Sequence, residues 1–213
     1  MEYIKALAKK FDSKIISETG EEYTVDNIDK FDYEGDILYG IEGISSRVKG
    51  EDSTLYSIFG INRIVSFNQE MIDRIENSDS PIDTFSNMVK EIQYLDAFSA
   101  NQRFFRNKED GKIIGAYTLT QNLRTILPYK PSVEFENSDM VKNEDIVFWN
   151  IGLVTIDGDE NDPNSYQVVG QLDYNDFIKK LPKDKYHFID ASYILVEPLS
   201  KEKILGLLEI SVN

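Results

Sequence analysis

The feature of this sequence that most constrains its fold is a helix-start signal at Ser80, followed by a long run of apolar residues at helical spacing. The Ser80 hydroxyl can cap a helix, and Pro81 suits the first helical position because a missing N–H costs nothing there. Beyond Pro81, apolar residues recur every three or four positions to about Phe105. The pattern predicts one long central helix over about residues 81–105, which would organise the core.

Short apolar runs on both sides of this helix predict strands. Residues 14–67 are broken by six glycines, a pattern typical of strands joined by turns or bulges. Residues 112–119 and 123–127 predict two more strands, which we expect to pair antiparallel. Residues 145–156 and 166–172 flank a polar loop and predict a β-hairpin. The region that precedes the long helix is therefore expected to be rich in strands.

Four shorter helices and one further strand complete the pattern. Apolar spacing predicts the first helix, and capping residues predict the other three. The first is a helix over residues 2–11, and the second is a helix of about ten residues that starts near Phe67 after a Ser66–Gln69 capping box. A short helix capped by Asp173 ends before Pro182. A strand over residues 186–196 and a helix from Ser200 to about Leu208 follow.

The predicted fold class is α+β, with a mainly antiparallel sheet, the long central helix and several short helices. No period of roughly 20 to 50 residues repeats, and no low-complexity linker separates two halves. We therefore expect a single domain over residues 1–213. If this domain is divided into two lobes, we expect the lobes to be residues 1–79 and 80–213.

The composition excludes several classes of site and of location. The chain has no cysteine and a single histidine, His187, which excludes disulfides, thiol catalysis, zinc fingers and multi-histidine metal centres. Its apolar runs are short, as in residues 146–149, whereas a membrane span needs about 20 apolar residues. The charged N-terminus lacks the apolar stretch of a signal peptide. We expect a cytoplasmic protein that enters no membrane and carries no cofactor.

The net charge of −15 is the most informative feature for function, because it is unevenly placed. Residues 17–36 hold eight acids and one lysine, and residues 134–162 hold nine acids and one lysine. These two segments account for the whole net charge, since the remaining residues carry equal numbers of acids and bases. Negative fields of this kind repel phosphate backbones and attract basic protein surfaces. Direct nucleic-acid binding by these segments is therefore not expected.

The acids of these segments are the candidate residues for binding a basic protein partner. They are Glu18, Glu21, Glu22, Asp26, Asp29, Asp32, Glu34 and Asp36 in the first segment, and Asp157, Asp159, Glu160 and Asp162 in the second. The hypothesis requires the two segments to lie close together in space. The competing and commoner interpretation is that acidic loops form an ordinary solvated surface that resists association.

Carboxylates could instead hold a metal ion. The loop over residues 157–164 has oxygen ligands at the first, third and fifth positions of a calcium-binding loop. It lacks the required glycine at the sixth position and the glutamate at the twelfth, so a plain surface loop is favoured. For a magnesium-dependent phosphodiesterase, two or three carboxylates and a lysine must converge. The candidate sets are Glu197, Glu202 and Lys203, and Asp173, Asp176 and Lys179. Neither set is convincing, and no metal site is assigned.

His187 and one basic stretch are the remaining candidates for chemistry. His187 has no identifiable acid partner and no nucleophile motif, so we interpret it as an ordinary residue of a sheet. Residues 103–130 carry a net charge of +4 and four aromatic side chains, which could contact single-stranded nucleic acid. We favour the interpretation that the phenylalanines complete the apolar face of the long helix while the bases offset its C-terminal dipole.

The sequence thus favours a cytoplasmic, non-enzymatic interaction protein whose acidic segments bind a basic partner. The most specific form of this hypothesis is an inhibitor or immunity-type protein, such as a phage anti-defence protein, that acts on a nucleic-acid-handling enzyme. Two alternatives stay open. One is a divalent-metal-dependent phosphodiesterase or nuclease, which requires carboxylates to converge in a cleft. The other is a structural or assembly subunit of a phage or mobile element, which would expose a large apolar patch.

Overall fold

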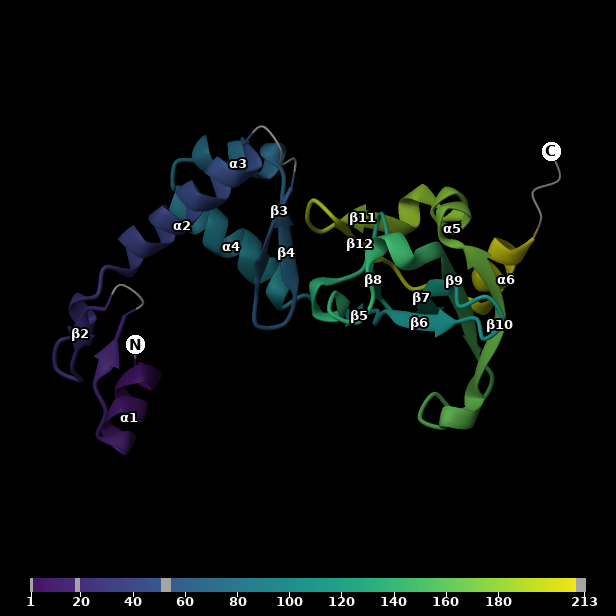
Figure 1. The fold of residues 1–213 in the computed structure, drawn as a ribbon, viewed down its shortest axis with the longest axis horizontal. Coiled ribbons are helices and arrows are strands. Elements are labelled where there is room, and N and C mark those ends of the chain that lie inside the picture. The colour runs from purple at the N-terminus through teal and green to yellow at the C-terminus, as the bar shows by residue number, and fades with distance from the viewer. Residues whose placement is uncertain (1, 18–19, 51–54, 210–213) are drawn as a thin grey trace.

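The computed structural model describes residues 2–17, 20–50 and 55–209, and its fold class is α+β with mostly antiparallel strand pairs, as predicted. Figure 1 shows an elongated molecule with its N-terminal elements at one end and its larger sheets at the other. The buried apolar side chains of the described residues form two clusters. The first core draws on residues 41–92, and the second core draws on residues 100–207.

The N-terminal elements are an amphipathic helix and a short hairpin. The helix predicted over residues 2–11 is confirmed as α1 (Glu2–Phe11). It is followed by β1 (Ile15–Ile16), β2 (Glu22–Tyr23) and the 3₁₀ helix η1 (Ile28–Lys30), and the two strands pair antiparallel. These elements contribute little to either core, because Ala8 and Ile28 are their only buried hydrophobic side chains among the described residues.

The prediction that residues 14–67 are rich in strands is wrong for the centre of this region, which forms a helix, whereas residues 15–16, 22–23, 56–59 and 64–67 do form strands. Helix α2 (Tyr33–Val48) is the longest helix within the described residues. Its buried apolar residues recur every three or four positions, which is the spacing of one helix face. They are Ile41, Ile44 and Val48. Gly40 and Gly43 face open space on the other side of the helix, so they mark an outer surface and not turns.

A hairpin and two more helices pack with α2 to form the first core. These elements are β3 (Tyr56–Phe59), β4 (Ile64–Phe67), α3 (Gln69–Glu76) and α4 (Pro81–Gln93). The predicted capping box of α3 is wrong, because Ser66 belongs to β4. Asn68 caps the helix instead, and its side chain accepts a hydrogen bond from the amide of Met71.

Helix α4 begins as predicted but ends at Gln93, so the long central helix over residues 81–105 is not formed. The Ser80 side chain caps it by accepting a hydrogen bond from the amide of Asp83. Beyond the helix, the chain forms β5 (Phe98–Ser99) and β6 (Arg103–Arg106). Pairing with distant strands therefore overrides the helical spacing of the apolar residues in this stretch.

Two four-stranded sheets and two helices enclose the second core. The remaining elements are β7 (Ile113–Thr120), β8 (Thr125–Pro128), β9 (Ile146–Ile156), β10 (Tyr166–Asp173), α5 (Tyr174–Lys180), β11 (Tyr186–Phe188), β12 (Tyr193–Val196) and α6 (Lys201–Leu208). One sheet has the strand order β10-β9-β7-β6, and the other has the order β11-β12-β8-β5. Helices α5 and α6 pack on β9 and β10.

Local predictions for this half are confirmed, whereas one long-range pairing is wrong. Strands β9 and β10 form the predicted hairpin, and Asp173 and Ser200 cap α5 and α6 as expected. The expected antiparallel pair of β7 and β8 does not form, because β7 pairs with β6 and β9 while β8 pairs with β5 and β12. The single strand predicted over residues 186–196 is a hairpin, β11 and β12, with Asp190 in its turn.

Candidate functional site

The structure does not bring the two proposed acidic segments together. Residues 20–36 surround β2 and the start of α2 at one end of the long axis, whereas the loop that joins β9 to β10 lies near the other end (Figure 1). The carboxylates of these segments therefore do not form one continuous acidic face. Glu18 lies outside the described residues.

Several acids of the first segment already have partners. Glu22 forms an ion pair with Lys14, and Asp29 forms one with Lys5. Asp32 caps α2 by accepting a hydrogen bond from the amide of Gly35, and Glu21 accepts a hydrogen bond from the hydroxyl of Tyr23. The remaining acids are exposed, and they are Asp26, Glu34 and Asp36. Part of the negative charge in this segment thus serves local structure.

The acids of the loop between β9 and β10 mostly hold its turns. Asp159 accepts a hydrogen bond from the amide of Asn161, and Asp162 accepts one from the amide of Asn164. The bond from the Asn161 amide, together with one from the Asn161 side chain, holds the pKa of Asp159 below its ordinary value. Asp157 forms an ion pair with a lysine of α6, and Glu160 is exposed. The loop geometry is that of a hydrogen-bonded surface loop.

The two cores meet at the turn between β11 and β12, where Asp190 holds them together. The buried Asp190 carboxylate accepts hydrogen bonds from the amides of Ser66 at 2.9 Å, Ser192 at 2.7 Å and Tyr193 at 2.6 Å. The amide of Ala191 donates to the carbonyl of Ser66 at 3.0 Å. Burial raises the pKa of Asp190, and the three amide bonds oppose this rise. The turn is thereby bonded to β4 of the first core.

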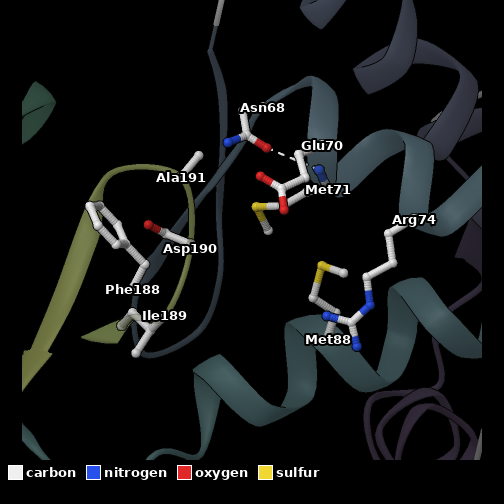
Figure 2. A pocket seen from close by; sticks show the side chains of 9 residues that line it. All are labelled: Asn68, Glu70, Met71, Arg74, Met88, Phe188, Ile189, Asp190 and Ala191. Carbon is white, nitrogen blue, oxygen red and sulfur yellow. Dashed lines mark hydrogen bonds between the residues drawn. The ribbon is translucent and has the colours of Figure 1, made fainter. Parts of the chain in front are cut away.

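Cavities border this junction on more than one side. One cavity of about 510 Å³ lies between the turn and helices α3 and α4 (Figure 2). Met71, Met88 and Phe188 give it apolar walls. Glu70 and Arg74 also line it, and Figure 2 shows that their head groups lie in different parts of the cavity, although the residues are one helical turn apart. Neither forms an ion pair with another described residue, so this cavity carries both signs of charge.

A smaller cavity, of about 180 Å³, lies on another side of the same turn. It is bordered by the segment before β4, by β5 and by the 3₁₀ helix η2 (Phe135–Asn137). Its charged groups are those of Arg63, Glu134 and Glu136, and its hydroxyl groups are those of Ser99 and Tyr193. Its apolar walls include Ile64, Ile126 and Ile189. Residues of both cores thus line a space that is partly polar and partly apolar.

Arg63 is held in place by the C-terminal end of α4. Its guanidinium donates hydrogen bonds to the carbonyl oxygens of Ile92 at 2.8 Å, Gln93 at 3.1 Å and Ala97 at 2.8 Å, and its Nε donates to Ser99 Oγ at 3.2 Å. The last carbonyls of a helix have no partner within the helix. Arg63 therefore caps α4, which accounts for the end of the helix at this position.

The opposite wall is organised by the side chain of Gln102. Its Nε2 donates to the hydroxyl of Tyr117 at 2.6 Å, and its Oε1 accepts hydrogen bonds from the amide of Glu134 at 3.0 Å and from the side chain of Asn137 at 3.1 Å. The Tyr117 hydroxyl donates to the Glu134 carboxylate at 3.4 Å. Gln102 thereby fixes η2 over β7 and directs where Glu134 lies.

Burial of these groups shifts their protonation. Burial raises the pKa of Glu134, the charge of Glu136 adds to this effect, and the hydrogen bond from Tyr117 opposes it. Burial also raises the pKa of Tyr117 and of Tyr193, with the charge of Glu134 as the next cause for each. The cavity therefore combines the hydroxyl of Tyr193, which burial keeps neutral, with the carboxylate of Glu134, whose ionised form burial disfavours. Such a group of acceptors suits a positively charged ligand.

The carboxylates proposed for metal-dependent hydrolysis are engaged elsewhere. Glu197 forms a bidentate ion pair with Arg124 at 3.1 and 3.2 Å, Asp173 caps α5, and Asp176 pairs with a lysine three residues on. Glu202 is exposed at the start of α6. Within residues 2–17, 20–50 and 55–209, no group of three or more His, Cys, Asp or Glu side chains is placed to hold a metal ion.

His187 lies on a strand, as expected, whereas the basic stretch does not have the expected structure. His187 is exposed on β11. The expectation that Phe104 and Phe105 complete the long helix is wrong, because both lie on β6. Phe104 contacts Trp149 with ring centroids 6.0 Å apart. The basic residues of this stretch are accordingly on strands and turns, and not at a helix C-terminus.

The residues that build the small cavity were not found by sequence patterns. Arg63 follows Asn62, and Gln102 lies between Asn101 and Arg103, and neither residue belongs to a recognisable motif. Glu134 and Glu136 fall within the acidic segment 134–162, so the charge pattern alone pointed to them. Their environment depends on contacts between segments that are distant in the chain.

Comparison with known proteins places the whole architecture within one family. A family model described as "Domain of unknown function (DUF4299)" matches residues 1–207, a range that includes both cores and the junction. No curated protein and no solved structure matches the chain. None of the helices in the described part of the chain has the length and apolar character needed to cross a membrane.

Proposed function

Because the chain belongs to the DUF4299 family, whose description assigns no activity, we propose from its geometry that it is a non-enzymatic interaction protein. Its ligand is a basic segment of another protein. The binding surface is the acidic aromatic patch, which we define as Phe59, Phe135, Glu136 and Asp139, together with the cavity beside it.

The observation that carries this proposal is an exposed aromatic pair with an acidic border. Phe59 on β3 and Phe135 on η2 are in edge contact with ring centroids 5.3 Å apart, and 62% and 71% of their surfaces are exposed. Interfaces are enriched in aromatic anchors at the centre and charged groups at the rim. Glu136 and Asp139 supply a negative rim, which favours a positively charged partner.

The distant acidic segments act on the same partner through their field. The exposed acids near β2 and in the loop between β9 and β10 lie away from the acidic aromatic patch. Charges beyond contact distance raise the rate of encounter and make it depend on salt, but they add little to the lifetime of a complex. The proposal thus assigns contact to the patch, which includes two acids of segment 134–162, and steering to residues 20–36 and the loop between β9 and β10.

The partner class that fits this charge best is a nucleic-acid-handling enzyme in the cytoplasm. Such enzymes present basic surfaces to phosphate backbones, and an acidic protein that covers such a surface would inhibit the enzyme. A chain without cysteine is compatible with a reducing compartment. An inhibitor role is therefore the specific form of the interaction that we propose.

The test immobilises the wild type and two variants and compares how much of a partner protein each retains. Both variants lose the same number of negative charges. The contact variant carries Glu136→Gln and Asp139→Asn, and the steering variant carries Asp159→Asn and Glu160→Gln. We expect the wild type to retain one basic protein of the native host, the contact variant to lose it, and the steering variant to retain it. Equal retention by both variants, or capture of no basic protein, would overturn the proposal.

A further inference from the structure

The small cavity beside the acidic aromatic patch suggests what anchors the partner. We propose that the cavity bordered by Glu134, Glu136 and Tyr193 is a guanidinium site that receives one arginine side chain of the basic partner. This inference rests on the proposed function and adds to it the residue type that the partner must present.

The first argument is that the cavity holds acceptors without a cation. None of the ion pairs formed among the described residues includes Glu134 or Glu136. Tyr193 borders the same cavity, and within the described residues its backbone amide and carbonyl are hydrogen-bonded, to Asp190 and Ile189, whereas its hydroxyl forms no hydrogen bond. The hydrogen bond from Tyr117 to Glu134 is long, at 3.4 Å. These groups retain acceptor sites that a ligand with several N–H donors can fill.

The second argument is that Arg63 cannot serve as the missing cation. It borders the cavity, but its guanidinium donates to three backbone carbonyls and to Ser99. A guanidinium has five N–H donors, so four of them are already engaged at α4 and β5. Arg63 therefore forms one fixed wall of the cavity and leaves the two carboxylates for another group.

The third argument concerns the size and the walls of the cavity. A volume of about 180 Å³ is below the roughly 300 Å³ at which pockets for complete small molecules begin, and it suits a single side chain. Ile64, Ile126 and Ile189 offer apolar contact for the methylene groups of that side chain. The walls distinguish this site from an acidic surface cluster, because they place the partly buried Glu134 beside apolar side chains.

Arginine fits better than lysine at this position. The guanidinium is planar, is more weakly hydrated than an ammonium, and can bond two carboxylates and a hydroxyl at once. Arginine is also among the residues that contribute most binding energy at interfaces. Burial raises the pKa of Glu134, and a cation in the cavity would reverse this shift. Occupation of the site would thus stabilise the ionised carboxylate.

The experiment uses the full chain and a defined probe. N-ethylguanidinium is titrated into the ¹⁵N-labelled protein, with N-ethylurea as a neutral probe of nearly the same shape. We expect N-ethylguanidinium to shift the backbone amides of Asn101, Glu136 and Tyr193, and N-ethylurea to shift them at least about tenfold less at equal concentration. Equal shifts from the two probes, or shifts centred on the loop between β9 and β10, would overturn the site.

Two variants distinguish binding in the cavity from general electrostatic attraction to the protein. Glu134→Gln should weaken binding of N-ethylguanidinium at least about tenfold, since truncation of one partner in a shielded charge pair is costly. Glu144→Gln removes the same charge from an exposed position that does not border the cavity, and it should leave binding unchanged. An equal loss of N-ethylguanidinium binding in both variants would show that the probe responds to the overall negative charge of the protein, and it would overturn the site.

The outcomes also distinguish this inference from the function on which it rests. Capture of a basic protein by both the wild type and Glu134→Gln, with equal affinity, would support the proposed function and overturn the arginine anchor. Binding of N-ethylguanidinium in a chain that captures no basic protein would support the guanidinium site and overturn the proposed protein partner.

Discussion

The carboxylate of Asp190 accepts a hydrogen bond from the amide of Ser66, which lies 124 positions earlier in the chain. This bond joins the turn of the β11–β12 hairpin to strand β4, and so it joins the second core to the first. The cavities described above border the same turn. The relative position of the two cores, and with it the shape of the candidate site, therefore depends on this buried carboxylate together with the backbone bond from Ala191 to Ser66.

Replacement of Asp190 tests this dependence. Asp190→Ala leaves the amides of Ser66, Ser192 and Tyr193 without their acceptor, and buried donors without partners are costly. We expect the free energy of unfolding to fall by about 2–4 kcal/mol. Asp190→Asn should cost less, because its remaining oxygen can still bond the two amides of the turn. Denaturant unfolding measures both values.

The control for this prediction is Asp184→Asn. Asp184 is an exposed carboxylate in the same part of the chain, and its replacement should leave stability within about 0.5 kcal/mol of the wild type. A stability of Asp190→Ala equal to that of this control would show that the turn is held by other contacts.

The starts of α4, α5 and α6 were predictable because their signals are local. Ser80, Asp173 and Ser200 each cap the helix that follows, as the sequence indicated. A cap needs only a short polar side chain and an amide two or three residues on, so a few consecutive residues contain the whole interaction. Helix ends were harder to predict, since α4 is ended by Arg63, a residue of another element.

Helix α2 shows how glycine can mislead. Gly40 and Gly43 suggested turns, yet both lie on an exposed helix face where no side chain is needed. Ile41, Ile44 and Val48 had the helical spacing throughout, and their burial decides the conformation. The pairing of β7 was missed for a related reason, because one of its partners, β9, lies beyond β8 in the chain and is reached only in the folded protein.

The candidate site was predictable only in its charge. The acidic segment 134–162 contains Glu134 and Glu136, but the sequence gives no reason to separate them from its other acids. Their distinct position arises from Gln102, whose amide bonds both Tyr117 and the backbone of Glu134. An isolated glutamine carries no motif, so only the folded chain reveals this role.

Gly115 provides a prediction about close packing within the sheet. Gly115 on β7 lies opposite Trp149 on β9, and a Cβ atom at this position would overlap the indole ring. The ring is held between Tyr117 and Phe104, so it has little room to move. Gly115→Ala should lower the free energy of unfolding by about 1–3 kcal/mol.

The matched control for this overlap is Gly152→Ala. Gly152 lies on the neighbouring strand β9, and a Cβ there would meet only the Tyr117 carbonyl oxygen at an ordinary 3.8 Å. The melting temperature of Gly152→Ala should stay close to that of the wild type. A loss of stability as large as that of Gly115→Ala would indicate a general intolerance of alanine in this sheet.

Neutralising the acidic loop should change the rate of association and not the fold. In the variant Asp157→Asn, Asp159→Asn, Glu160→Gln and Asp162→Asn, the asparagine oxygens can still accept the amide bonds of the turns. Steering by the lost charge is long-range, so association with the captured partner should slow at low salt and match the wild type at high salt. Surface plasmon resonance separates the two rates. A faster dissociation would instead place the loop in the interface.

Divalent cations should have little effect on stability. A ligand that binds only the folded state raises the melting temperature, so a calcium or magnesium site would be visible in a thermal scan. The carboxylates of the loop between β9 and β10 are occupied by their own backbone. Addition of millimolar CaCl₂ or MgCl₂, against a matched concentration of NaCl, should therefore shift the midpoint by less than about 1 °C. A dose-dependent rise of several degrees would reinstate a metal site.

Glu134 should lower stability at neutral pH, and its replacement should raise it. Burial is the main cause that raises the pKa of Glu134 above 4.5, so its ionised form is less stable in the folded chain than in the unfolded chain. This cost is present in full above the raised pKa. It disappears as the pH falls through the raised pKa to below 4.5, where both states are protonated. Glu134→Gln removes the ionisation and keeps an oxygen that can accept from Tyr117.

The variant should accordingly melt at a higher temperature than the wild type at pH 7, with a difference that shrinks as the pH is lowered toward 4.5. Glu144→Gln, at an exposed position, should show no such pH dependence. Thermal scans over this pH range provide the measurement, and a lower melting temperature of Glu134→Gln at pH 7 would contradict it. A gain in stability together with a loss of guanidinium binding would separate a ligand-binding carboxylate from a structural one, because removal of a structural carboxylate lowers stability.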